Sequence, residues 1–459
     1  MNKIFNYCCL LLLLTPSVVI AQSNSPNIVI LFADDMGYAD LSCYGSNEND
    51  TPVLDKLASE GMKFTDFYAG SAVCSPSRAS LLTGRFAVRA GIYSWVSERA
   101  PHKMHLHRDE VTIAELLKKR GYATAHIGKW HLGFDLVNGS GPRPTPGDQG
   151  FDYWFATINN AKPSHHNPRN FVRNGKEMGT IEGYSSHIIV EEASDWLDNY
   201  RNPEEPFFLN IWFHEPHHPV AAPEVLNKKH ENTNLPAYYG SIENMDIAVG
   251  QLLRKLEEIG ASKNTFIVFM SDNGSYRWDS NIPFKAGKTK LWEGGIRVPG
   301  IIKWPGNITP GSQQIAPAGV VDILPTIAEI TDVALPDKTI DGSSLVPLFK
   351  NNIMERNKPL YWFYSPSRPA VAILDGDWNM VADPEMKIPT DNMFQEEWIG
   401  MVKETGLTNF KLYNLRKDPG QQNDLSEVNP EKFEEMKIKL LKLHRDVVDE
   451  AIDWRTFQF

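Results

Sequence analysis

The chain has 459 residues, with 46 Lys or Arg against 57 Asp or Glu, and therefore a formal net charge of −11. Hydrophobic residues make up 42% and charged residues 22%, a composition that excludes a disordered chain. The acidic excess argues against a nucleic-acid-binding protein, and four Cys are too few for a disulfide-rich scaffold. The length allows about one to three domains.

The N-terminus predicts an export signal. Lys3 precedes a short apolar stretch, and the small residue Ala21 marks a cleavage site. The stretch is too short for a comfortable bilayer span, so we expect no stable membrane insertion, with an uncleaved anchor as the alternative. We expect a signal peptide over residues 1–21 and a periplasmic or secreted protein. Cleavage would leave two thiols, Cys43 and Cys74, which could pair or include one with a chemical role.

The following residues alternate short apolar runs with amphipathic segments, which is typical of an α/β sheet. We expect buried strands over residues 28–33, 122–127, 207–213 and 265–270. Between them we expect helices over residues 52–60, 112–119 and 239–259. This part, over residues 22–350, is predicted to be a catalytic α/β domain.

The pattern changes beyond about residue 350. We expect antiparallel strands over residues 359–364, 370–374, 378–382 and 411–415, followed by a helix over residues 430–452. The prediction is a smaller C-terminal α+β domain over residues 351–459 that packs on the first.

Polar side chains follow directly after all four buried strands of the larger domain. In chain order they are Asp34 and Asp35, Lys129 and His131, His214 and His217, and Asp272 and Asn273. Ligands of open α/β sheets bind at the carboxyl ends of the strands, so we expect these groups at one edge. Lys129 and His131 are two residues apart, and an extended segment would place both on one face with Trp130 on the other.

The acids and the amide in this set predict a metal site. Asp34, Asp35, Asp272 and Asn273 offer hard oxygen donors, which favour Ca²⁺ or Mg²⁺ over Zn²⁺. Taken singly, each pair is also ordinary turn chemistry. Their position at the ends of two buried strands favours the metal.

Residues 74–84, CSPSRASLLTG, predict a helix with Ser75 as N-cap, Pro76 in the first position and Gly84 as the stop. Cys74 would then lie at a helix N-terminus, which favours anions, with Arg78 in the first turn. That position suggests a thiolate of lowered pKa, although a buried thiol beside a surface Arg is the alternative. A thiolate suits a hard-cation site poorly, so we expect different chemistry at Cys74.

The run CSPSRASLLTGR closely resembles the consensus of the sulfatase family, in which this Cys is oxidised to Cα-formylglycine. Further motifs stand in family order: PN at 26–27 with DDMGY at 34–38, GKWHLG at 128–133, PHHP at 216–219, SDNG at 271–274, GK at 287–288 with EGGIRVP at 293–299, and LYNL at 412–415 with DP at 418–419. The resemblance covers nearly the whole exported chain and is nearest to the arylsulfatase A and N-acetylgalactosamine-6-sulfatase branch. It implies an alkaline-phosphatase-like α/β/α sandwich with a smaller C-terminal α+β domain.

The resemblance also implies the cofactor and the roles of the site residues. Cys74, as a formylglycine hydrate, would be the nucleophile and a ligand of Ca²⁺, with Mg²⁺ as the second choice. The other metal ligands would be Asp34, Asp35, Asp272 and Asn273. Arg78 and Lys129 would hold the formylglycine oxygens, and His217 and Lys288 would bind sulfate and assist the leaving oxygen. One hydroxyl of the hydrate would attack sulfur to form a covalent sulfate ester, and His131 would deprotonate the second to release sulfate.

The expected activity is hydrolysis of a sulfate ester on a saccharide, from a glycosaminoglycan or an algal polysaccharide. The expected partners are this substrate and a formylglycine-generating or anaerobic maturation enzyme. The alternatives are a phosphate or phosphonate ester hydrolase of the same superfamily and a non-catalytic carbohydrate-binding relic with unmodified Cys74. The sulfate position, exo or endo action and the oligomeric state stay open.

Several other residues invite a functional interpretation. His102, His105 and His107 have ligand-like spacing, but we expect a mobile polar loop there. His165, His166 and Arg169 lie in a Pro/Asn-rich loop that either lines the substrate pocket or is solvated. We also expect Cys43 to be buried and unpaired, His214 to lie behind the ligands or toward the substrate, and residues 191–198 to form a solvated helix face.

Overall fold

The computed structural model describes residues 25–97, 103–137, 143–350, 352–389 and 396–456. The expected signal peptide over residues 1–21 and His102 lie outside the described residues. Within these ranges, no helix is both long enough and apolar enough to cross a membrane.

An 11-stranded sheet forms the centre of the molecule. Its five parallel central strands lie in the order β8 (Thr265–Ser271), β1 (Asn27–Asp34), β7 (Phe207–Pro216), β3 (Ala123–Lys129) and β4 (Tyr153–Thr157). Beyond β8, β9 (Arg297–Lys303) runs antiparallel between β8 and β2 (Met62–Tyr68). The short edge strands are β5 (Val172–Arg173), β6 (Lys176–Glu177), β10 (Ser312–Gln314) and β11 (Ala318–Gly319). All four strands that the sequence predicted for this domain are therefore confirmed.

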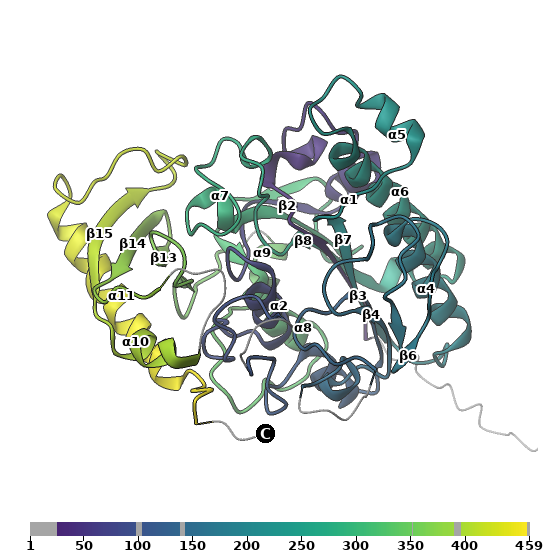
Figure 1. Ribbon diagram of the computed structural model, residues 1–459, viewed down its shortest axis with the longest axis horizontal. Coiled ribbons are helices and arrows are strands. Elements are labelled where there is room, and N and C mark those ends of the chain that lie inside the picture. The colour runs from purple at the N-terminus through teal and green to yellow at the C-terminus, as the bar shows by residue number, and fades with distance from the viewer. Residues whose placement is uncertain (1–24, 98–102, 138–142, 351, 390–395, 457–459) are drawn as a thin grey trace, which may run out of the picture.

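Helices cover both faces of the large sheet, because alternate residues of each strand point to opposite sides. In β1, Ile28, Ile30 and Phe32 belong to one hydrophobic core, whereas Val29 and Leu31 belong to the other. The second core lies under α1 (Pro52–Glu60), α4 (Ser185–Asn199) and α6 (Pro236–Glu258). The first lies under α2 (Cys74–Thr83), α3 (Ile113–Lys118) and α8 (Ile323–Ile330). The expected α/β/α sandwich is confirmed (Figure 1).

A second sheet has four antiparallel strands, β12 (Leu360–Phe363), β13 (Val371–Asp375), β14 (Trp378–Pro384) and β15 (Leu407–Asn414). The long helix α11 (Pro430–Glu450) packs against it, so the α+β pattern expected after residue 350 is confirmed. Figure 1 shows this sheet and α11 on the opposite side of the molecule from α4 and α6. Its buried residues share one core with α2 and α8, so the domain boundary near residue 350 stays a proposal.

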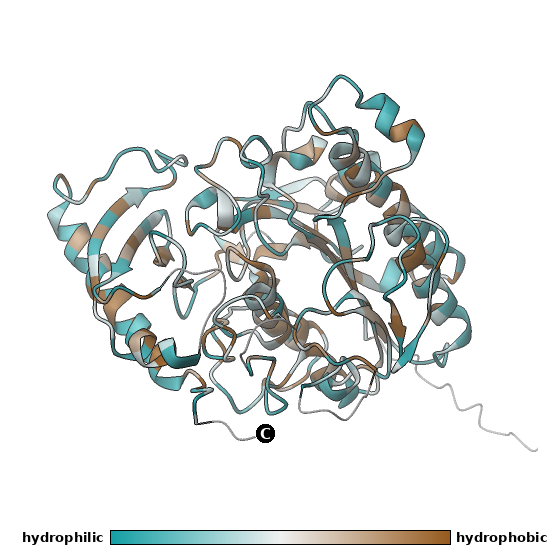
Figure 2. Cartoon of the chain, viewed as in Figure 1, coloured by the Kyte–Doolittle hydropathy of each residue, from teal (hydrophilic) through white to brown (hydrophobic). Residues whose placement is uncertain are grey.

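The remaining helices are short: α5 (Glu224–Lys229), α7 (Glu293–Ile296), α9 (Val346–Phe349) and α10 (Ile399–Glu404). Figure 2 shows hydrophobic residues concentrated toward the interior, whereas the outlying helices α5 and α11 are largely hydrophilic. The amphipathic α11 therefore turns its apolar side, including Leu440, Leu443 and Val447, toward the second sheet.

Candidate active site

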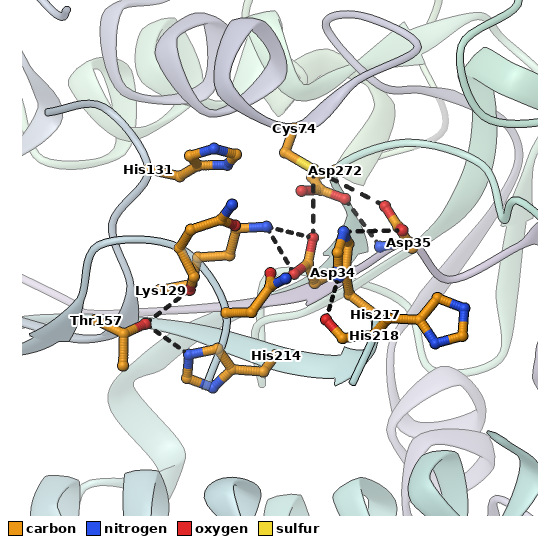
Figure 3. Close-up of polar contacts among 12 residues, drawn as sticks. Asp34, Asp35, Cys74, Lys129, His131, Thr157, His214, His217, His218 and Asp272 are labelled. Atoms are coloured by element: carbon orange, nitrogen blue, oxygen red, sulfur yellow. Dashed lines mark hydrogen bonds and ion pairs between the residues drawn. The ribbon is translucent and has the colours of Figure 1, made fainter. Parts of the chain in front are cut away.

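The polar residues expected after the four strands meet at one edge of the large sheet (Figure 3). Asp34 ends β1, and Asp35 turns the chain away with a left-handed φ of 65°. Asp272 and Asn273 follow β8 directly and lie beside them, with the Asp35 amide donating to Asp272 Oδ1 at 3.0 Å. All four side chains are buried. The parallel register of β1 and β8 produces this cluster, because it aligns their carboxyl ends.

Buried cations lie against these carboxylates. Lys129 Nζ is 2.8 Å from Asp34 Oδ2, and Lys288 Nζ is 2.7 Å from the Asp35 carboxylate. Arg78 bridges two acids through Nη2, at 2.7 Å from Asp272 Oδ2 and 3.2 Å from Asp34 Oδ1. Burial raises the pKa of Asp34, but Lys129, His217 and Arg78 outweigh it and hold that pKa well below its ordinary value.

Cys74 is the first residue of α2 and lies directly over the acid cluster. Its Sγ is 3.5 Å from Asp34 Oδ1 and 3.6 Å from Lys288 Nζ. The prediction of Ser75 as N-cap is wrong, because the helix begins at Cys74, two residues earlier than expected, and the Ser75 hydroxyl accepts from the Val96 amide instead. Burial raises the pKa of the Cys74 thiol far above its ordinary value, so the helix N-terminus does not produce the thiolate that its position suggested.

The donor set fits a hard divalent cation. Ligand atoms of Asp34, Asp35, Cys74 and Asp272 all lie within 4.8 Å of one another. Asn273 donates its Nδ2 to Asp35 Oδ1 at 2.8 Å, whereas its buried Oδ1 has no hydrogen-bond partner among the described residues. Oxygen donors from carboxylates and an amide are the ligands that Ca²⁺ and Mg²⁺ prefer. An unpartnered amide oxygen beside clustered carboxylates is what a cation site requires.

His131 reaches the site by a different backbone path from the one expected. The extended conformation predicted for residues 129–131 is wrong, because His131 has a left-handed φ of 57°. Trp130 stacks on Trp212 with ring centroids 6.0 Å apart and anchors this turn in the core. The His131 Nε2 lies 2.9 Å from the Val96 carbonyl, and the buried Nδ1 has no partner among the described residues. Burial, with Lys129 and Arg78 nearby, lowers the pKa of His131, so the ring is neutral at pH 7.

Two residues of the site reach solvent. The side chains of His217 and Lys288 are 18% and 16% exposed, whereas Asp34, Arg78 and Lys129 are fully buried. His217 Nε2 is 3.5 Å from Asp35 Oδ2, and the ring Nδ1 is 2.6 Å from the His218 carbonyl. Burial lowers the pKa of His217 to about 4. Burial also opposes the charge of Lys288, but Asp35 and Cys74 raise its pKa above the ordinary value. His217 and Lys288 are thus the parts of this cluster that a ligand in solvent can contact directly.

A buried carboxylate that the sequence analysis missed supports the His217 segment. Glu215 accepts hydrogen bonds from the Ser185 hydroxyl, from the Ser186 amide at 3.1 Å and from the His214 amide at 3.2 Å. It thereby fastens the end of β7 to the first turn of α4. An acid inside the run HEPHHP could have signalled this contact, but only the fold brings Ser185 next to it.

Two histidines next to this contact are fully buried. His165 Nδ1 lies 3.7 Å from Glu215 Oε1, so both expected roles of His165, pocket-lining and solvated, are wrong. His214 lies behind the acid cluster, where its Nε2 is 2.8 Å from the Thr157 hydroxyl oxygen, which confirms one of the two positions expected for it.

The remaining sequence-based expectations, for the other histidines, Cys43 and the acidic helix face, are confirmed only in part. The mobile loop expected around His105 is wrong, because His105 is buried with its ring 4.8 Å from that of Trp454. His166 is exposed and stacks on Tyr184. Cys43 is half-buried rather than buried, and both it and Cys74 are free thiols, as expected. The helix face over residues 191–198 is only partly solvated, because Glu192 is buried and pairs with Arg173.

Comparisons with known proteins find relatives in both sequence and fold. A sequence model of the sulfatase family matches residues 26–333. N-acetylgalactosamine-6-sulfatase from Rattus norvegicus is 34% identical over 378 residues, which cover 76% of this chain and 70% of the relative. Arylsulfatase A from Homo sapiens is 31% identical over 480 residues, covering 95% of this chain and 91% of the relative. The crystal structure of Ps i-CgsB in complex with k-i-k-neocarrahexaose superposes with a TM-score of 0.79 at 26% identity and covers 95% of both chains.

Proposed function

This chain belongs to the sulfatase family and is a sulfuric ester hydrolase, and we propose that its substrate is a sulfate ester on a saccharide. The observation that best supports this proposal is the position of Cys74 at the N-terminus of α2, directly over three buried carboxylates. These carboxylates form ion pairs with Arg78, Lys129 and Lys288. The relatives support a saccharide substrate, since one is named for an acetylated amino sugar and another binds a neocarrahexaose.

We propose Asp34, Asp35, Asp272 and Asn273, together with residue 74, as the ligands of Ca²⁺, with Mg²⁺ as the less favoured ion. A divalent cation at this position would stabilise negative charge on the nucleophilic oxygen and on sulfate. Without it, the charges of the three carboxylates and the three cations balance. The added positive charge would make the pocket attractive to an anion despite the net charge of −11.

We propose that Cys74 is oxidised to formylglycine after translation by a maturation enzyme, and that the protein is exported to the periplasm or beyond. The hydrate of formylglycine supplies two hydroxyls on one carbon, one to attack sulfur and one to release the sulfate afterwards. Arg78 and Lys129 hold oxygen atoms at residue 74, since both already contact the acids beneath it. The neutral ring of His131 can accept a proton through its unpartnered Nδ1.

His217 and Lys288 form the side of the site nearest to solvent and would meet the ester itself. Lys288 is cationic and contacts both Asp35 and Cys74, so it can bind a sulfuryl oxygen above the nucleophile. His217 is held through Nδ1 by the His218 carbonyl, which leaves Nε2 facing the cluster. Asp35 raises the pKa of His217 against the effect of burial, and a proton held on Nε2 can pass to the departing alkoxide.

Peptide mass spectrometry and one substitution test this proposal. We expect the peptide that contains residue 74, from protein made in its own host, to carry an aldehyde that reacts with a hydrazide probe. Cys74→Ser lacks the second hydroxyl, so we expect sulfatase turnover to fall at least about 1,000-fold. Cys43→Ser is the matched control and should keep full activity, because Cys43 lies outside the site. Only thiol at residue 74, or full activity of Cys74→Ser, would refute the mechanism.

The substrate class needs a separate experiment. We expect sulfate release from defined sulfated oligosaccharides, measured by ion chromatography, and a kcat/KM at least about 100-fold lower for matched phosphate monoesters and phosphonate esters. A preference for phosphate would support the alternative ester hydrolase of the same superfamily. Saccharide binding without turnover, by protein that carries the aldehyde, would support the non-catalytic alternative.

A further inference from the structure

A cavity of about 640 Å³ adjoins the candidate active site on the side of His131. This volume falls within the range of about 300–1,000 Å³ that is usual for ligand pockets. Val96 and Ile158 both line the cavity, and both hold His131 through their carbonyl oxygens, at 2.9 Å from Nε2 and 2.8 Å from the amide. The walls of the cavity and the position of His131 are therefore set by the same two residues.

The cavity combines apolar and polar walls. Phe134, Ile158 and Phe171 supply apolar surface, and Asn159, Asn170 and Arg169 supply polar groups. Such a mixture suits a sugar ring, which offers C–H faces together with hydroxyl groups. Figure 3 shows His131 and Thr157 on the side of the cluster away from His217 and His218, so the cavity extends the site in that direction.

The segment that carries Arg169 is held firmly. The Arg169 amide donates to the Lys162 carbonyl at 2.8 Å. Asn170 closes the same loop, because its Oδ1 accepts from the Lys162 amide and its Nδ2 donates to the Asn160 carbonyl, both at 2.8 Å. A cation on a fixed backbone binds with less loss of conformational entropy than one on a loose loop.

The charges of the cavity favour an anion at Arg169. Arg169 is exposed, and its guanidinium has no ion-pair partner in the described part of the chain. Of the two acids in the lining, Asp135 lies beside Arg143, whereas Glu177 lies on the exposed edge strand β6. Another cavity of about 650 Å³ differs in this respect, because its charged groups already pair with one another, as Arg85 with Glu450 at 2.6 Å and Lys338 with Glu110 at 3.2 Å.

We propose that this cavity binds the sugar ring next to the sulfate ester, and that Arg169 holds a second anionic group on that ring or on its neighbour. The group is a carboxylate or a second sulfate, both of which match the planar fork of a guanidinium. This inference rests on the proposed function. It narrows the substrate class to saccharides that carry at least two anionic groups.

Arg169→Ala and Arg169→Lys test the inference, with Arg254→Ala as the matched control on the exposed side of α6. The assay compares kcat/KM for a small aryl sulfate with kcat/KM for two oligosaccharide series. One series pairs a uronate-containing substrate with its carboxyl-reduced form, and the other pairs a disulfated substrate with its monosulfated form. We expect Arg169→Ala to lower kcat/KM at least about 10-fold for one charged member, mainly through KM, and Arg169→Lys to recover part of it.

The aryl sulfate separates this inference from the proposed function. We expect Arg169→Ala to hydrolyse it within about twofold of wild type, and Arg254→Ala to match wild type throughout. The series that responds identifies the anion as a carboxylate or a sulfate. Equal losses on aryl sulfate and saccharides, or no loss on any charged saccharide, would overturn the role of Arg169 while sulfate release by wild type still supports the proposed function. Failure of wild type to release sulfate from any ester would instead refute the proposed function.

Discussion

At the scale of single residues, the site is a balance of buried charges. Burial raises the pKa of Asp272 to about 7, with Arg78 opposing and Asp34 and Asp35 adding to the effect. The same burial acts on Asp34, but Lys129, His217 and Arg78 together lower its pKa by more than burial raises it. Three carboxylates this close to one another are costly to ionise together, and a divalent cation would offset the cost. Residues chosen for chemistry therefore also determine local stability.

Chelation tests this balance. We expect EDTA to lower the melting temperature by several degrees and added Ca²⁺ to restore it, because a ligand at about 100 times its Kd stabilises the folded state by about 2.7 kcal/mol. Differential scanning fluorimetry measures the shift. Asn273→Ala removes one oxygen donor and should respond less to Ca²⁺. Identical melting curves with and without EDTA would contradict a structural role of the metal.

At the scale of elements, signals from neighbours in sequence predicted helix ends only in part, because the stop at Gly84 is confirmed and the N-cap at Ser75 is wrong. Thr112 caps α3, with its hydroxyl oxygen accepting from the Glu115 amide at 3.2 Å. Gly84 ends α2 with a left-handed φ of 65°. The glycine at position 128, in the motif GKWHLG, is not a helix cap. A Cβ there would lie 1.9 Å from the Trp212 carbonyl oxygen of β7. The pairing with β7 therefore leaves no room for a side chain, and the left-handed φ of 116° also favours glycine there.

The contact of α11 with the second sheet contains a titratable group. His444 of α11 is buried, and its Nδ1 lies 2.8 Å from the Tyr361 hydroxyl of β12. Burial lowers the pKa of His444 to about 4. The unfolded chain, with an ordinary His pKa near 6.5, binds a proton at a pH where the folded protein does not. Stability from this residue is thus present above pH 6.5 and lost as the pH falls toward 4.

The lowered pKa of His444 predicts a measurable difference in pH-dependent stability between wild type and a variant without this histidine. We expect wild type to lose about 2 kcal/mol more unfolding free energy than His444→Gln between pH 7 and pH 5, because Gln keeps a polar contact with Tyr361 but does not titrate. Urea denaturation at the two pH values provides the numbers. His166→Gln, at an exposed position, should show the pH dependence of wild type. Equal pH dependence in wild type and His444→Gln would contradict this account.

At the scale of the whole molecule, the ion pairs of a buried arginine join α11 to the large domain. Arg89, which is 1% exposed, contacts Asp341 at 3.0 Å and also pairs with Asp446 and Glu450 of α11. Trp454, just after α11, donates to the Gly91 carbonyl at 2.7 Å. The segment after α2 is therefore fastened to residues 446–454.

Arg89→Met should weaken the whole molecule. Removing the cation takes one of two cationic partners from the buried Asp341, which keeps Lys358 at 2.8 Å, and also breaks the pairs with the more exposed Asp446 and Glu450. We therefore expect a loss of about 2–3 kcal/mol in unfolding free energy, measured by urea denaturation. Arg445→Ala breaks an exposed pair on the same helix and should cost less than about 0.5 kcal/mol. Stability of Arg89→Met within about 1 kcal/mol of wild type would show that this network does not hold α11 in place.

The amino-acid order by itself determined the central strands, the main helices and the set of residues at the strand ends. These features depend on local periodicity, on capping and on the rule that the carboxyl ends of parallel strands meet at one edge. The family motifs predicted the proposed nucleophile position and its neighbours for the same reason, since each motif is a short contiguous run.

Only the tertiary structure decided the features that arise from residues far apart in sequence. The turn at His131 depends on contacts with Val96 and Ile158. The segment that carries His217 is held by the hydrogen bond between Glu215 and Ser185. The protonation state of the Cys74 thiol also depends on the tertiary structure, because burial raises its pKa and outweighs the effect of the helix N-terminus. Burial and long-range contacts are sums over the whole fold, and no local pattern in the chain encodes them.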